Sequence, residues 1–130
     1  MEIRIERMSD EFTKYHLLGL PRSIVLHHFT DRDKGSPHDH PWGFKSIVLF
    51  GGYTERVYHM TEDKKVWWTE EIERREGDIF EIDAEHVHEL IHLPQGQCLT
   101  SVFPRWEKRE WGFWTFDLNG AHFEKAEKQE

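Results

Sequence analysis

The chain has 130 residues, with 17 lysines and arginines against 25 aspartates and glutamates, a net charge of -8. This length accommodates one domain with one core. The negative charge disfavours broad binding to nucleic acid or anionic membrane, and no segment reaches the ~20 apolar residues that a membrane-spanning helix needs. We therefore expect a single domain over residues 1–130 that binds a small molecule, with no nucleic-acid or membrane partner.

Cysteine content and the N-terminal segment bear on the cellular compartment. Cys98 is the single cysteine of the sequence, so an internal disulfide is excluded, as is usual in a reducing compartment. The opening "MEIRIERMSDEF" is too charged for a secretory signal. These features predict a cytoplasmic protein in which Cys98 is a buried core thiol, with a nucleophilic role as the alternative.

The two ends of the chain differ from its centre. The segment "SDEFTKYHLLGLPR" predicts a short N-terminal helix, with Ser9 or Asp10 as its N-cap and Gly19 with Pro21 as its stop. Residues 119–130 are charged and predict a solvated tail. The core of the domain is therefore expected between about residues 23 and 118.

The centre of the chain carries strand signals. Short runs rich in β-branched and aromatic residues alternate with turn clusters such as "TDRDKGSP" and "PQGQ". About eight strands at regular spacing predict an all-β sandwich or barrel. The expected strands are residues 23–29, 45–50, 53–60, 65–70, 78–82, 86–93, 98–103 and 111–116.

Gly51 and Gly52 separate two of these strands and predict a tight hairpin, because both accept a positive φ. Pairing across such a hairpin would divide the side chains of the two strands between two sides of the sheet. We expect the more apolar side to face the interior. Glu55 would point inward with them. The expected interior set is Phe44, Ser46, Val48, Phe50, Tyr53 and Val57.

Histidines occur in pairs one residue apart. In an extended backbone, residues i and i+2 point to the same side, so His38 with His40, and His86 with His88, each form a same-side pair. Three neutral imidazoles drawn from both segments suit Fe(II), Zn, Ni or Cu and leave coordination positions open. The alternative is that these are surface histidines at strand ends.

Two segments resemble the sequence motifs of the cupin superfamily. "HDHPWGFKSIVLFGG" is similar to the first cupin motif, and "GDIFEIDAEHVH" is similar to the second. More narrowly, "HDHPW", "GGYTE" and "REWGFW" resemble small single-domain cupins of bacteria and phages. The resemblance implies a double-stranded β-helix, an RmlC-like jelly roll. It also implies a single divalent metal ion, Fe(II) first and then Zn, Ni or Mn, bound by His38, His40 and His88.

The chain departs from the cupin pattern at one ligand. The family usually supplies a glutamate about five residues after the second histidine, and here that neighbourhood is Phe44 and Lys45. A three-histidine set resembles that of thiol dioxygenases and implies a dioxygenase-like metal enzyme. Glu55 is our candidate catalytic residue, as a fourth ligand or a general base; the alternative is a solvated strand carboxylate.

Other residues are expected to contact a substrate. Trp42 follows the first histidine pair and could wall one side of the pocket, together with Tyr53. Arg105 is the preferred anchor for an acidic substrate, and the alternative for this arginine is a surface ion pair.

Two other classes of function stay open. A metal-independent sugar or nucleotide-sugar isomerase or epimerase would use His88 or Glu55 as its base. A non-catalytic cupin that binds a small ligand is the other class. Exposed aromatic side chains and strand edges also predict a homodimer.

Overall fold

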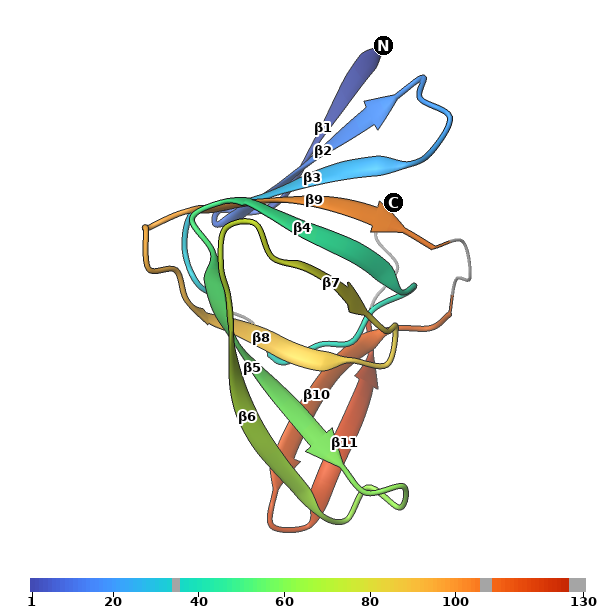
Figure 1. Cartoon of the computed structure of the whole chain (residues 1–130). Coiled ribbons are helices and arrows are strands. Elements are labelled where there is room, and N and C mark those ends of the chain that lie inside the picture. The colour runs from blue at the N-terminus through green and yellow to red at the C-terminus, as the bar shows by residue number, and fades with distance from the viewer. Residues whose placement is uncertain (34–35, 106–108, 127–130) are drawn as a thin grey trace.

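The computed structural model describes residues 1–33, 36–105 and 109–126, which form eleven strands in two facing layers (Figure 1). No helix occurs among these residues, and none is therefore long and apolar enough to cross a membrane. The strands are β1 (Glu2–Ser9), β2 (Phe12–Leu18), β3 (Ile24–Phe29), β4 (Phe44–Phe50), β5 (Tyr53–Met60), β6 (Trp67–Arg74), β7 (Ile79–Ile82), β8 (Val87–His92), β9 (Cys98–Pro104), β10 (Gly112–Asp117) and β11 (Gly120–Lys125).

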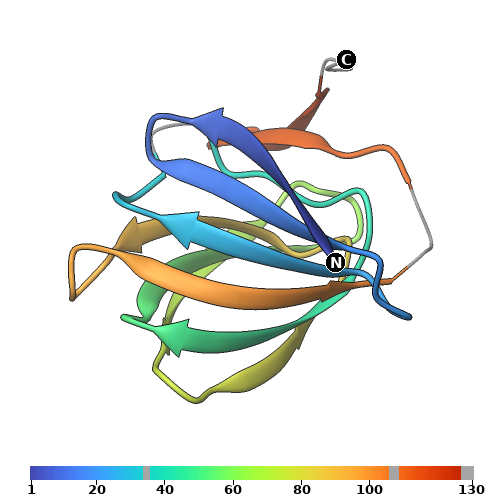
Figure 2. The ribbon, with the colours of Figure 1, turned by 90° about the horizontal axis from the view of Figure 1, so that it is seen from above.

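The first layer is a six-stranded antiparallel sheet in the order β1-β2-β3-β9-β4-β7 (Figure 2). The second layer contains the sheet β6-β5-β8 and the hairpin β10-β11. His38 joins these two parts through bridges to His88 on one side and Phe113 on the other. Two antiparallel sheets that face each other in this way form a jelly roll, so the predicted all-β fold is confirmed.

The core lies between the two layers at the end opposite the histidine pairs. Its buried members are Phe29, Val48, Tyr53, Leu90, Leu93 and Cys98. Alternation along the strands places them inward, because every second residue of a strand faces the same side. Burial raises the pKa of the Cys98 thiol to about 11. Cys98 is thus the predicted core thiol.

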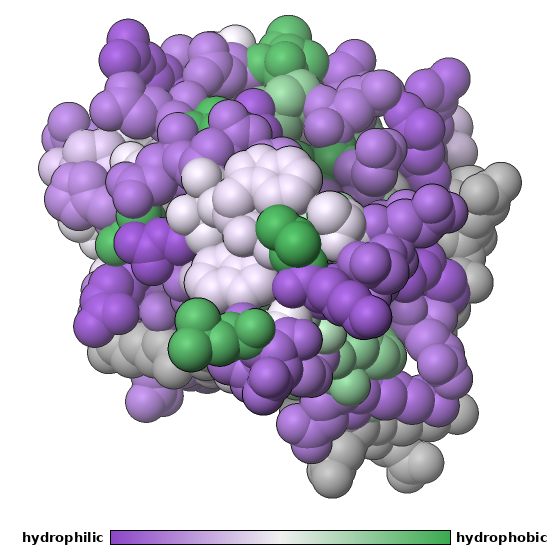
Figure 3. Space-filling view, turned by 90° about the horizontal axis from the view of Figure 1, so that it is seen from below, coloured by the Kyte–Doolittle hydropathy of each residue, from purple (hydrophilic) through white to green (hydrophobic). Residues whose placement is uncertain are grey.

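The hairpins β5-β6 and β10-β11 pack against each other through aromatic side chains. The Tyr58 and Phe116 rings stack with centroids 4.4 Å apart, and Trp67 Nε1 donates a hydrogen bond of 2.8 Å to the Asp117 carbonyl. Seen from below, pale aromatic side chains lie among mostly hydrophilic ones (Figure 3). These contacts hold β10 beside the segment that carries His38.

The predicted hairpin at Gly51 and Gly52 is wrong, because the two glycines turn the chain from one layer to the other. β4 pairs with β9 and β7, whereas β5 pairs with β6 and β8. The interior side was nevertheless predicted correctly for Ser46, Val48 and Tyr53. Phe50 is 44% exposed because the register with β9 shifts after Val48, which breaks the alternation.

The N-terminal helix is also wrong. Residues 12–18 form β2, which pairs with β1 on one side and β3 on the other. Hydrogen bonding to β3 outweighs a weak local preference for helix, because sheet pairing satisfies the whole backbone of the segment. Residues 120–125 of the expected tail form β11, and residues 127–130 lie outside the described residues.

Alanine at Gly51 is expected to destabilise the protein more than alanine at Gly77. Both glycines have a positive φ, 84° and 88°, so each substitution adds backbone strain of about 1–2 kcal/mol. A Cβ at Gly51 would also collide with the Gln97 carbonyl oxygen, whereas a Cβ at Gly77 meets no described atom within 4 Å. Urea unfolding of both variants measures the difference, and equal losses would contradict the close approach at this corner.

Candidate metal centre

The segment that carries His38 and His40 is an extended piece of chain inserted between β8 and β10. The His38 amide donates to the His88 carbonyl at 3.0 Å, and the His88 amide donates back to the His38 carbonyl at 3.1 Å. On the other side, the Asp39 amide donates to the Gly112 carbonyl at 3.1 Å. The two histidine pairs, about fifty residues apart in sequence, are therefore neighbours within one sheet.

Asp39, the residue between the two histidines, anchors this segment. It is 1% exposed and points to the opposite side from both imidazoles. Its carboxylate accepts hydrogen bonds from the Gly112 amide at 2.7 Å, from Trp114 Nε1 at 3.3 Å and from Arg109 Nη1 at 3.3 Å. The "REWGFW" segment thus supplies the contacts that hold the first histidine pair in place.

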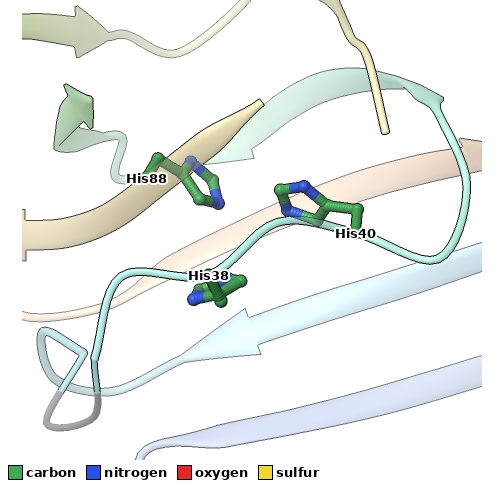
Figure 4. Close-up of side chains that lie close together, drawn as sticks. All are labelled: His38, His40 and His88. Carbon is green, nitrogen blue, oxygen red and sulfur yellow. The ribbon is translucent and has the colours of Figure 1, made fainter. Parts of the chain in front are cut away.

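His38, His40 and His88 bring their rings together at the inner face of this layer (Figure 4). The ring centroids are 5.3 Å apart for His38 and His40, 5.0 Å for His38 and His88, and 4.8 Å for His40 and His88. With metal–nitrogen distances of about 2.0–2.1 Å, three imidazoles around one ion place their centroids roughly 5 Å apart. The three-histidine group therefore fits a single metal ion.

The electrostatic state of the group also suits a metal. Burial, reinforced by the positive charge that His88 would carry, lowers the pKa of His38 to about 3 and that of His40 well below its usual value. Both rings are thus neutral at pH 7, the form that binds a metal. His40 Nδ1 is buried and has no hydrogen-bond partner within the described part of the chain.

Glu55 lies behind His88. It is 0% exposed, and its Oε1 accepts hydrogen bonds from His86 Nε2 at 2.6 Å and from His88 Nδ1 at 3.0 Å. Its Oε2 accepts one from Arg74 Nε at 2.8 Å. Burial raises the pKa of the Glu55 carboxyl, but hydrogen bonds from His86, His88 and Arg74 outweigh it, and the pKa lies well below the usual range. The carboxylate fixes the orientation of the His88 ring.

His86 is paired with His88 in the sequence but is not among the ligands that the cupin motifs imply. Together with Glu55 and His88 it forms a second group whose ligand atoms lie close enough to hold a metal. Its same-side spacing with His88 was the signal that could have identified it. His86 also lines a cleft of about 530 Å³, whose other lining residues include Asp39, Tyr58, Glu85 and Arg109.

The residues that were predicted to contact a substrate do not join the three-histidine group. Tyr53 is 6% exposed and belongs to the hydrophobic core. Arg105 forms an exposed ion pair with Glu81, so the alternative interpretation of this arginine is the one observed. Trp42 lies half-buried in the bend between His40 and β4, and its substrate role stays a prediction.

Solved structures of other proteins share this fold. A cupin-2 domain from Rhodospirillum rubrum is 11% identical, with a TM-score of 0.59, and the match covers 88% of this chain and 75% of that chain. The hydroxypropylphosphonic acid epoxidase of S. wedmorenis is 13% identical with a TM-score of 0.56, over 78% of this chain and 55% of the epoxidase. An oxalate oxidase is 16% identical with a TM-score of 0.51, over 70% of this chain and 45% of the oxidase.

These likenesses establish the class of fold. The chain has the cupin fold, as the sequence motifs predicted. It spans about half the length of the epoxidase and of the oxalate oxidase, and at these identities the likeness concerns the fold and not the activity. No protein-family model matches the sequence, and no curated protein is significantly similar to it.

Metal content will distinguish the two possible ligand groups. If His38, His40 and His88 hold the ion, replacing any one of them by alanine should lower bound metal from about one ion per chain to below roughly one tenth. His86→Ala should retain the metal, and so should His122→Ala, a partly exposed control on β11. Elemental analysis measures this. Loss of metal in His86→Ala with retention in His38→Ala would assign the ion to the Glu55 group instead.

The metal-free protein should lose stability on acidification. The unfolded chain takes up a proton on His38 near pH 6.5, but the folded protein does so only near pH 3, because burial and the His88 charge lower the pKa. The free energy of unfolding therefore falls as the pH decreases from 6.5, by up to about 1.4 kcal/mol per pH unit for one such site. In urea unfolding between pH 7 and pH 4, the free energy of unfolding should depend less on pH in His38→Gln than in the wild type. An equal dependence on pH in the two proteins would contradict this role of His38.

Proposed function

We propose that the protein is a mononuclear-metal enzyme of the dioxygenase-like type that acts on a small molecule. The observation that carries this proposal is the convergence of three imidazoles, two of them held neutral by burial, on one point between the layers. Three protein ligands leave positions open for other molecules, as a catalytic site requires.

Each residue of the site has a distinct task in this proposal. His38, His40 and His88 hold the ion, and Glu55 keeps His88 in the tautomer that presents Nε2 to it. Arg74 balances the buried carboxylate and lies over the Phe80 ring, 3.9 Å from its centroid. When bound, such an ion supplies Lewis acidity and, in the case of Fe(II), redox chemistry with O₂.

Fe(II) is the preferred ion within the proposal. Imidazole ligands suit iron, zinc, nickel and copper, so the donor set alone does not choose among them. Support for iron comes from the resemblance of a carboxylate-free three-histidine set to thiol dioxygenases. Two of the structurally similar proteins, an epoxidase and an oxalate oxidase, are also oxidising enzymes by name.

A second candidate function is a metal-independent isomerase or epimerase. The observation that favours it is the pair formed by His86 and Glu55, joined by a hydrogen bond of 2.6 Å, with His86 facing the cleft. A histidine oriented by a buried carboxylate can act as a general base. Such an enzyme would stay active without metal and lose activity in His86→Gln.

Anaerobic loading with Fe(II) tests the leading proposal. We expect about one iron per chain and an iron–nitrosyl EPR signal on exposure to NO, since open positions accept the diatomic ligand. O₂ uptake with a panel of small thiols and carboxylic acids should then depend on iron. His88→Ala should lose both the signal and the uptake, and His122→Ala should keep both. Turnover of sugar nucleotides by chelator-treated protein, lost in His86→Gln, would support the isomerase instead.

A further inference from the structure

The inner face of the six-stranded sheet is apolar toward one edge of the sheet and carries ionisable side chains toward the other. A cross-strand row runs from Glu6 through Lys14, His27 and Thr100 to Val48. Thr100 and Val48 are 3% and 1% exposed, so the whole row faces the space between the layers. The row is therefore apolar at β4 and ionisable at β1 to β3.

Lys14 is a half-buried cation without a direct partner. Its ammonium lies 5.8 Å from the Phe12 ring centroid and forms no hydrogen bond or ion pair with any residue that the structure describes. Glu6, directly opposite on β1, instead accepts a hydrogen bond of 2.8 Å from His16 Nε2. Burial lowers the pKa of Lys14, and the nearby Glu6 charge opposes this shift. A half-buried charge without a hydrogen-bonded partner is costly, which makes this position a candidate for ligand binding.

His27 lies beside Lys14 on the same inner face. Its ring contacts Phe12 and Phe29, with centroids 5.0 Å and 6.2 Å apart, and forms no hydrogen bond within residues 1–33, 36–105 and 109–126. Burial first, and then the Lys14 charge, lower the pKa of His27 well below its usual value. Its neutral imidazole therefore keeps one N–H donor for a ligand.

The three-histidine group is on the facing wall of the same space. His38 belongs to the second layer, between β8 and β10, whereas Lys14 and His27 belong to β2 and β3 of the first. The Lys14 charge contributes to the lowered pKa of His38, as expected for groups that share one interior.

We propose that Lys14 and His27 form an anion subsite that binds the carboxylate of a small substrate while its other end faces the three-histidine group. This inference rests on the proposed function and names the substrate class. Lys14 supplies one positive charge, and Glu6 is its cross-strand neighbour. Glu6 repels any bound anion, and a phosphate dianion about twice as strongly as a singly charged carboxylate, so the carboxylate is the better match for this subsite. The Phe12 and Phe29 rings suit an apolar chain next to the acid group.

Propionate and propionamide test the subsite, because they have nearly the same shape and differ in charge. Ligand-observed NMR titrations should give a Kd for propionate at least about tenfold lower than that for propionamide, as expected for a charge-assisted hydrogen bond. Lys14→Met should remove this preference, and Lys14→Arg should retain most of it. Lys65→Met, an exposed control, should behave as wild type. Thermal unfolding checks that each variant is folded.

The same titrations on metal-free and zinc-loaded protein separate the subsite from the metal centre. A preference for propionate that persists in metal-free wild type supports the subsite even if no metal is ever bound, so the two proposals can fail independently. Equal binding of the two probes, or no binding of either, would overturn it. A preference that survives in Lys14→Met and vanishes without zinc would place the anion on the metal and would also overturn it.

Discussion

The insertion of one short segment between β8 and β10 is the constraint on which the rest of the site depends. His38 exchanges backbone hydrogen bonds with His88, and the buried Asp39 carboxylate ties the segment to Gly112 and Trp114. Without this pairing no backbone hydrogen bonds would join β8 to β10, and the two histidine pairs would not be held at a common point. The same hydrogen bonds therefore complete the sheet and assemble the candidate metal centre.

A buried carboxylate then sets the chemistry of that centre. Glu55 has lost its contact with water and is compensated by three donors, from His86, His88 and Arg74. A charge buried in this way is tolerated only when its hydrogen bonds are complete. In return, the hydrogen bond from His88 Nδ1 to Glu55 fixes the His88 ring, so that only its other nitrogen, Nε2, faces the interior. His86 donates to the same Glu55 oxygen as His88, so Glu55 has a role in both of the functions that we propose.

The space between the layers has two unlike ends. One end is filled by the core around Val48, Tyr53 and Cys98, and the other holds the three-histidine group. Since the apolar end provides the packing, the polar end can keep groups that are not internally satisfied, such as His40 Nδ1. Polar groups that a stable core would exclude are therefore concentrated at the candidate metal centre.

The sequence by itself determined what depends on local alternation. The eight expected central strands, the inward side of Ser46, Val48 and Glu55, and the same-side histidine pairs all follow from the period of two residues in an extended chain. Resemblance to cupin motifs added the choice of His38, His40 and His88.

Tertiary structure alone decided how the strands were paired. It made Gly51 and Gly52 a corner, converted the expected N-terminal helix into β2, brought Glu55 to His86 and His88, and left Arg105 in an ion pair with Glu81. The physical reason is that strand partners and buried hydrogen bonds join residues far apart in the chain, and no local pattern encodes which of them meet.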